Sequence, residues 1–139
     1  MLQFQIKTYT PQRDKAPHSF YVLSKGLNSG RPSATPCPNS FVVSAGNPEE
    51  RETLYWLTYA IWKSRALYPL LRGSVIPFIT VRDFTRQLAA ACQSIPPTDE
   101  RIQKVVTALK KLDETEAQAR GQIKIIAEAR QLIARKLLS

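Results

Sequence analysis

The chain has 139 residues, 43% of them hydrophobic, and its 20 lysines and arginines against 11 acidic residues give a formal net charge of +9. This hydrophobic content excludes wholesale disorder, and the lack of any window of roughly 18 apolar residues excludes a membrane span. The first residues show no pattern of a secretory leader. Two cysteines are too few for a disulfide framework, so we expect a cytoplasmic protein without membrane association.

Three segments have the patterns of β-strands. Apolar and polar residues alternate over residues 2–7, and residues 19–25 and 40–45 are rich in aromatic and β-branched side chains. Residues 26–39 are dense in Gly, Pro, Asn and Ser, which predicts a long loop with no regular element. The simplest sheet pairs the second and third strands as a wide hairpin with the first alongside, and it needs helices over its apolar face.

The first helix is predicted to begin at Asn47, where Asn47 can cap, Pro48 suits the first position and Glu50 can close a capping box. Arg72 and Gly73 supply a cation and a glycine stop, so the helix should run to about residue 71. Its apolar residues form two stripes, which predicts either cover on two sides or a partner for the aromatic side. The aromatic stripe consists of Tyr55, Tyr59, Trp62 and Ala66.

The apolar run around Pro77 predicts an edge strand or a buried extended connector, because proline cannot donate to a β-ladder. A second helix follows, capped by Thr80 or Asp83 and ending near Ile95. Residues 1–95 are therefore expected to form an α+β domain, with a small antiparallel sheet of about three strands covered by helices.

Residues 96–139 are expected to form a long C-terminal helix or a helical hairpin. A seam with alternating spacings of three and four runs along this segment, and nine of its eleven positions are apolar, as in a coiled coil. These positions are Ile102, Val105, Leu109, Leu112, Glu116, Ala119, Ile123, Ile126, Arg130, Ile133 and Leu137. A continuous helix would be about 60 Å long and would need to pair with another chain. A break near Gly121 would instead fold it back on the first helix, and the sequence leaves both alternatives open.

Candidate catalytic residues are sparse. His18 is the only histidine, and Cys37 would be its natural nucleophile. The predicted hairpin separates the two by roughly 20 Å, far beyond hydrogen-bond reach. Capping and the helix dipole account for the acidic residues at the helix starts. Since no cluster has metal-ligand spacing, the sequence predicts no enzyme, no catalytic residue, no metal and no cofactor.

The most unusual segment is the loop from Lys25 to Arg31, which places two cations around two glycines. Converging backbone N–H groups there could bind an anion; alternatively, the glycines only supply positive φ. The first helix runs back along the sheet for about 36 Å, which should bring further arginines to the same end. The residues predicted to bind nucleic acid or another anion are Lys25, Asn28, Ser29, Arg31, Arg65 and Arg72.

Two stretches carry a family resemblance: residues 20–32, followed by Pro36-Cys37-Pro38-Asn39, and residues 71–79. They resemble small uncharacterised proteins of gut Bacteroidetes and of their conjugative or phage-like mobile elements. The resemblance covers about residues 19–95 and brings no assigned activity. It implies a mobile-element setting, which favours DNA-related or host-interaction roles by association only.

The leading functional hypothesis is a basic accessory protein that binds nucleic acid through non-specific phosphate contacts. The alternative is an oligomeric protein–protein interaction module, with a homodimer formed through the C-terminal heptad helix. A third hypothesis is binding of a small anion or nucleotide at the glycine loop.

Overall fold

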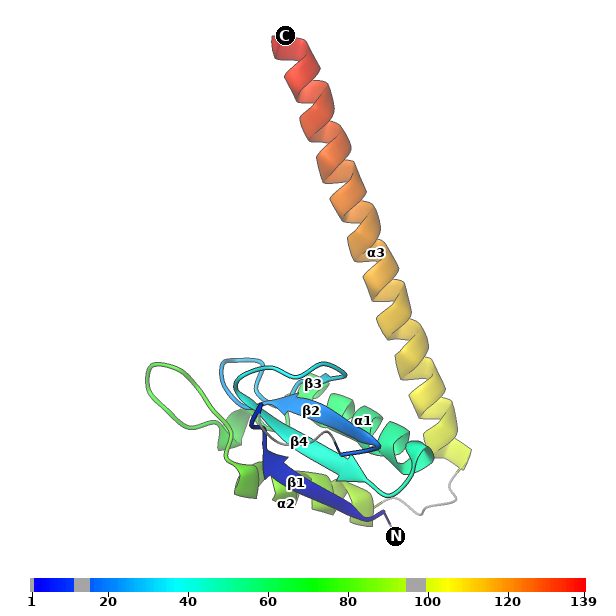
Figure 1. Cartoon of the computed structure of the whole chain (residues 1–139). Helices are drawn as coiled ribbons and strands as arrows, with labels where there is room; N and C mark the ends of the chain where they lie inside the picture. Colours follow the sequence, from blue (N-terminus) through cyan, green and yellow to red (C-terminus); the bar gives the residue numbers. More distant parts are fainter. Residues whose placement is uncertain (1, 12–15, 95–99) are drawn as a thin grey trace. The chain divides into compact units, whose positions relative to one another are not determined.

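The computed structural model describes residues 2–11, 16–94 and 100–139 and divides into two units, Met1–Asp99 and Glu100–Ser139 (Figure 1). The first unit combines an antiparallel sheet with helices and the second is one long helix, so the predicted α+β class is confirmed. The expected boundary at residues 95 and 96, like the expected helix end near Ile95, lies outside the described residues.

The sheet has four strands in the order β1-β4-β2-β3. Its strands are β1 (Phe4–Thr8), β2 (Ser19–Leu23), β3 (Pro32–Ser33) and β4 (Ser40–Ala45). β4 pairs antiparallel with β2 on one side and with β1 on the other, as the hairpin prediction required.

The two-residue strand β3 lies within the segment that was expected to contain no regular element. It pairs with the outer edge of β2, where Pro32 faces Val22. An edge position suits Pro32, because proline has no N–H to donate and an edge strand does not need that hydrogen bond. Residues 24–31 therefore form a turn between two paired strands, which we call the glycine turn.

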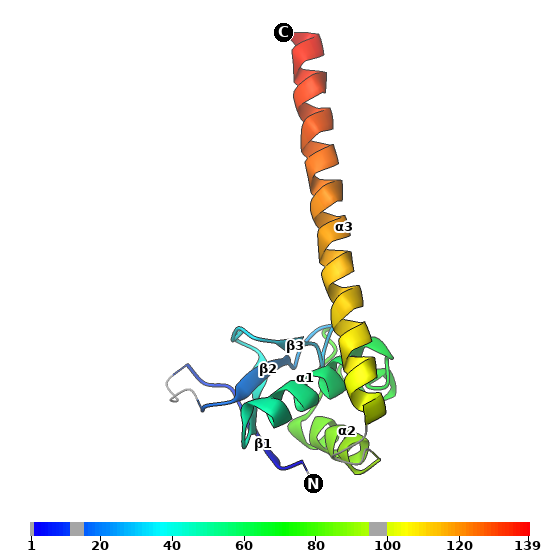
Figure 2. The same cartoon turned by 90° about the vertical axis from the view of Figure 1, so that its right-hand side faces the viewer.

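α1 (Pro48–Lys63) and α2 (Val81–Gln93) cover the same face of the sheet, as the view in Figure 2 shows. Alternating residues of β2 and β4 meet the apolar sides of these helices, as expected for a sheet with one buried face. The core includes Phe20, Val22, Phe41, Val43, Leu54, Ile61, Leu67, Ile79, Phe84 and Leu88.

Both helices begin with a side-chain cap. The Asn47 side-chain oxygen accepts the backbone N–H three residues on, at 2.8 Å. The Thr80 hydroxyl oxygen does the same for α2, at 3.1 Å, so Thr80 is the cap and Asp83 lies in the first turn. These caps satisfy N–H groups that a helix start leaves without a partner.

α1 ends at Lys63 and does not continue to about residue 71 as expected. The Ala66 N–H donates to the Ile61 carbonyl at 3.2 Å, and the Arg65 N–H donates to the Trp62 carbonyl at 3.1 Å. These two bonds make a Schellman motif, which usually has glycine at the position that Arg65 occupies here, with φ of 63°.

A short 3-10 helix, η1 (Tyr68–Leu70), follows α1 and leads to an extended pair between Arg72 and Phe78. The Arg72 N–H and carbonyl each bond to Phe78, both at 2.9 Å, and close a loop of residues 73–77 that we call the finger. Arg72 therefore cannot complement the dipole of α1, because it does not belong to the last turn of that helix.

α3 (Glu100–Leu138) is a continuous helix of 39 residues. Gly121 does not break it, so the helical hairpin is not formed. A glycine costs a helix only about 1 kcal/mol relative to alanine, and the neighbouring residues are good helix formers.

The glycine turn rests on the chain that follows α1. Gly30 has φ of 97°, and a Cβ there would overlap the Cδ1 atom of Leu67, which is buried in the core. Gly26 also has positive φ, 93°, but its Cβ would meet no atom within 4 Å. Comparing substitutions at Gly26 and Gly30 therefore distinguishes the cost of the backbone conformation from the cost of lost close packing.

We predict that Gly30→Ala destabilises the fold by about 3 kcal/mol and Gly26→Ala by about 1 kcal/mol. Both variants place alanine in the left-handed region, which costs about 1 kcal/mol of stability. Only the alanine at position 30 also overlaps the side chain of Leu67, which adds the cost of overpacking. Urea unfolding followed by fluorescence measures both, since both tryptophans lie in α1. Equal losses for the two variants would contradict close packing at Gly30.

Candidate nucleic-acid interface

Charge is distributed unevenly along the first unit. Residues 16–48 and 53–82 contain no Asp or Glu, whereas Glu49, Glu50 and Glu52 cluster at the start of α1. Cations occur at the last residue of α1 and after it. One end of α1 is therefore acidic and the other is basic. The basic end is the one that contacts the glycine turn.

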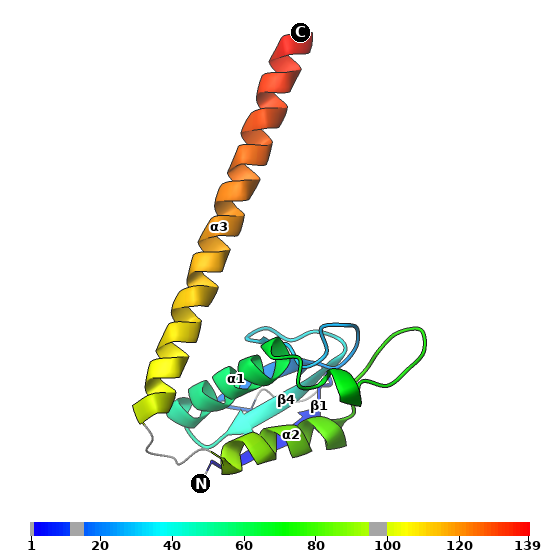
Figure 3. The same cartoon turned by 180° about the vertical axis from the view of Figure 1, so that it is seen from behind.

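Two sets of contacts join the segments at this end. The Gly26 N–H donates to the Pro77 carbonyl at 2.7 Å, which ties the glycine turn to the finger. Gly30 packs against Leu67 and Trp62, which ties the same turn to the end of α1. Figures 1 and 3 show the turn and the finger projecting from the same end of the sheet.

Trp62 lies between two cations. The Arg31 Cζ is 5.9 Å from the centroid of its ring and the Lys63 Nζ is 4.8 Å from it. Trp62 is half-buried, so part of this residue is accessible to solvent. Lys63 is not among the residues predicted from the sequence, where its position directly after a tryptophan is the signal that could have pointed to it.

A second cation–ring pair follows directly. The Arg65 Cζ is 5.5 Å from the centroid of the Tyr68 ring, and Tyr68 is 46% exposed. The left-handed conformation of Arg65 turns the chain so that this pair forms within four residues. Both cations at the end of α1 therefore carry an aromatic partner.

Lys25 and Arg72 flank Phe78 on opposite sides, since each forms a β-bridge with it. Residues directly opposite in a ladder point to the same face, so the side chains of Lys25 and Arg72 leave the same side, about 10 Å apart at their Cα atoms. Arg72 is also paired: its Nη2 lies 3.3 Å from Oδ2 of Asp83. Asp83 therefore neutralises part of the charge that Arg72 brings to this end.

We call Lys25, Arg31, Lys63, Arg65 and Arg72 together the basic pole.

Asn28 and Ser29 behave differently from the cations. Ser29 is 3% exposed and its hydroxyl donates to the Gly26 carbonyl at 2.6 Å. The backbone N–H groups of Ser29, Gly30 and Arg31 also donate within the turn and to β2. These donors hold the turn together, so what the loop offers to an anion is its cationic side chains and the exposed Asn28.

The apolar run of residues 74–79 was expected to be a buried connector or an edge strand, and only its second part agrees. Phe78 forms β-bridges and Ile79 is buried in the core, whereas the finger projects into solvent. Val75 is 88% exposed and Ile76 is 62% exposed, at the tip of the loop closed by Arg72 and Phe78. An apolar run is normally read as buried, but the closing hydrogen bonds force these residues out of the core. Solvent-exposed apolar side chains thus stand beside the basic pole.

The aromatic residues considered for base stacking are only partly available. Tyr21 and Trp56 are buried, whereas Tyr55 and Trp62 are half-buried. Along α1 the rings form a ladder of edge-to-face contacts, with centroids 5.3 Å apart for Tyr55 and Trp56 and 5.7 Å apart for Tyr59 and Trp62. Trp62 is the end of this ladder and the member that reaches the basic pole.

His18 lines a hollow of about 430 Å³ with Tyr21, Thr35 and Arg51, and Cys37 is not among the residues around it. Cys37 lies near the start of β4, where its carbonyl accepts the Ser40 hydroxyl at 2.7 Å. Burial raises the pKa of the Cys92 thiol, which favours its protonated form. Among the residues described, no group of His, Cys, Asp or Glu could hold a metal ion.

The chain matches a known protein family. Within the described ranges, no helix is long and apolar enough to cross a membrane. Neither the curated proteins nor the solved structures contain a match to the chain. Residues 6–136 match a family of unknown function, DUF6943, and the chain belongs to that family.

Proposed function

We propose that this protein binds nucleic acid, with the basic pole contacting phosphates and the adjoining rings contacting bases. The alternation of cations and aromatic rings carries the proposal: Trp62 lies between Arg31 and Lys63, and Tyr68 lies beside Arg65. Lysine and arginine supply the sequence-independent part of such binding, and rings supply stacking for unpaired bases.

Magnitudes favour this use of Trp62. A cation over a ring at an exposed site contributes about 0.5–1 kcal/mol, whereas stacking a base on a ring contributes about 1–3 kcal/mol. A base can therefore displace Arg31 or Lys63 from the ring at a net gain. The displaced cation is then free to meet a phosphate of the same strand, so single strands are the preferred ligand.

The conformation of Arg65 supports the proposal. A side chain in the left-handed region costs about 1 kcal/mol that glycine would avoid, and retained strain of this kind is common at functional sites. Arg65 places a guanidinium beside Tyr68 at that cost.

The finger fits the same ligand. Proteins that bind the minor groove of duplex DNA often insert apolar side chains between base steps next to their cationic contacts, and unpaired bases expose the same apolar faces. Val75 and Ile76 are exposed on the segment that the Arg72–Phe78 pair closes, so they can reach bases while Arg72 meets the backbone.

The first test removes two cations from the basic pole. We expect Arg31→Ala/Lys63→Ala to lower the affinity for a labelled oligothymidylate about tenfold at low salt. Its slope of log affinity against log salt should fall by about 1.4, at about 0.7 per lost contact. Fluorescence anisotropy across a salt series measures both quantities.

Lys111→Ala/Lys124→Ala is the matched control, since it removes the same charge from exposed positions of α3. Equal effects of the two double variants would contradict a localised interface. Binding to vesicles rich in anionic lipid, with no binding to single or double strands, would replace nucleic acid by a membrane surface as the ligand.

Replacing Arg65 should change the stability of the fold and the affinity for nucleic acid in opposite directions. We expect Arg65→Gly to raise the free energy of unfolding by about 1 kcal/mol, because glycine relieves the left-handed conformation. The same variant should bind oligothymidylate several-fold more weakly, since one phosphate contact is lost. Urea unfolding and anisotropy on one preparation decide this, and a variant that gains stability but keeps full affinity would remove Arg65 from the interface.

The finger has its own test. We predict that Val75→Ser/Ile76→Ser weakens binding of single strands about tenfold while leaving the salt slope unchanged, because apolar contacts release no counterions. Unfolding should hardly change, since both side chains are exposed. An unaltered affinity would exclude the finger from the interface.

A second candidate function, self-association, is favoured by α3. This helix is continuous, and apolar residues of its heptad seam are exposed, among them Leu112, Ile123 and Ile133. A second chain would cover them, as in a coiled coil.

A further inference from the structure

α3 carries two charged residues within its otherwise apolar seam, Glu116 and Arg130. They lie two heptads apart, and the seam positions between them are Ala119, Ile123 and Ile126. A buried charge is costly unless an opposite charge neutralises it. The positions of these two residues therefore bear on how a second helix can lie along the seam.

A parallel dimer in register is disfavoured by this pattern. Each seam residue would face its own copy, so Glu116 would meet Glu116 and Arg130 would meet Arg130. Two layers of like charge would then lie inside the interface, each with a repulsive cost. Glu116 also forms an ion pair with Arg120 on its own helix, and this does not relieve the Arg130 layer.

We propose that α3 pairs with α3 of a second copy of this chain in the antiparallel direction, centred on Gly121. This proposal deepens the second candidate function, self-association. In this register, residues whose numbers sum to 242 face each other, so that Val105 faces Leu137, Leu109 faces Ile133 and Ala119 faces Ile123. Every seam residue from 105 to 137 then has a partner in the other copy, over about 48 Å.

The same register neutralises the charges. Glu116 faces Ile126 of the second copy, and the next layer pairs Leu112 with Arg130 of the second copy. Glu116 and that Arg130 are thus about 6 Å apart along the axis, within reach of an arginine side chain. The contact occurs twice by symmetry. Shifting the pairing by one heptad in one direction separates Glu116 from Arg130 of the second copy. Shifting it by one heptad in the other direction shortens the paired seam.

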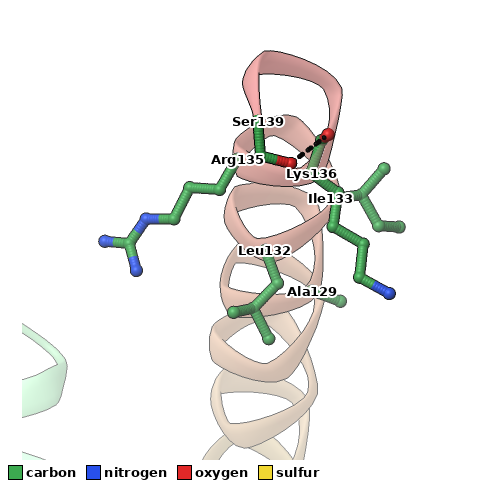
Figure 4. A pocket seen from close by; sticks show the side chains of 6 residues that line it. All are labelled: Ala129, Leu132, Ile133, Arg135, Lys136 and Ser139. Carbon is green, nitrogen blue, oxygen red and sulfur yellow. Dashed lines mark hydrogen bonds between the residues drawn. The ribbon is translucent and has the colours of Figure 1, made fainter.

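Apolar residues outside the seam enlarge the exposed surface near the C-terminus. Leu132 and Ile133 line a shallow hollow of about 550 Å³ there. Figure 4 shows these two side chains on the last turns of α3, with Arg135 and Lys136 extending from the helix. In the antiparallel register this end lies along the start of the other α3, where Val105, Val106 and Leu109 supply apolar side chains. The exposed end of one helix is therefore covered by the beginning of its partner.

The two helix starts would lie about 63 Å apart, because Glu100 is 21 residues from the centre in each copy. Each start is where the chain leaves its own first unit. A dimer built in this way would carry two basic poles on separate first units, which suits a protein that joins two nucleic-acid segments.

Disulfide trapping tests the direction of pairing. In the full chain with Cys37→Ser and Cys92→Ala, we add Val105→Cys or Leu137→Cys and oxidise each variant alone and in an equimolar mixture. The antiparallel pair predicts a covalent dimer in the mixture, joining one residue of each type, and little in either variant alone. Dimers from each variant alone would establish a parallel pair and overturn the proposal.

Charge reversal tests the register and the self-association itself. Arg130→Glu should raise the dimer dissociation constant at least tenfold, and adding Glu116→Arg should restore it; Arg135→Glu, outside the seam, is the matched control. Light scattering and sedimentation measure all four chains. A strictly monomeric protein at high concentration would overturn self-association and leave nucleic-acid binding by the first unit to be judged on its own experiments.

Discussion

The packing of Gly30 against Leu67 is the contact on which the cationic end of the first unit depends. It requires a residue without a Cβ at the turn, and it requires the chain after α1 to bend back toward the sheet. With both conditions met, the glycine turn, the end of α1 and the finger become neighbours. Without that contact, Arg31 and Lys63 would not share the ring of Trp62.

The end of α1 shows how local strain and surface chemistry are linked. The Schellman motif stops the helix at Lys63 and turns the following residues toward Tyr68 and the buried Leu67. Leu67 anchors the bend in the core, and Arg65 carries a positive charge at the strained position. Glu49, Glu50 and Glu52 lie at the other end of α1, so Asp83, which pairs with Arg72, is the acidic residue that reduces the positive charge of the basic pole.

Much of the fold could be predicted from the sequence because its signals are local. Strand alternation, the cap at Asn47 and the cap at Thr80 each depend on a few adjacent residues. The end of α1 could not be predicted, since Arg65 carries no signal for a left-handed conformation. The exposure of Val75 and Ile76 could not be predicted for a related reason, because an apolar run gives no sign that hydrogen bonds between Arg72 and Phe78 hold it outside the core.

The candidate site was predictable in its location more than in its chemistry. The predicted topology brings to one end the cations Lys25, Arg31, Arg65 and Arg72, and the contacts of the glycine turn join these segments there. The sequence could not reveal that Ser29 is buried or that Asp83 pairs with Arg72, because both depend on contacts between distant segments. The sequence also could not distinguish a continuous C-terminal helix from a helical hairpin, since the cost of one glycine does not determine whether a long helix breaks.

The most direct measurement is the response of the two tryptophan indole N–H resonances to a single-stranded oligonucleotide. Trp62 adjoins Arg31 and Lys63, whereas the indole N–H of Trp56 donates to Glu52 near the acidic end of α1. We predict that the Trp62 resonance shifts on titration and that the Trp56 resonance stays in place. A titration in which Trp62 remains unmoved, while the oligonucleotide binds elsewhere or does not bind at all, would contradict the account.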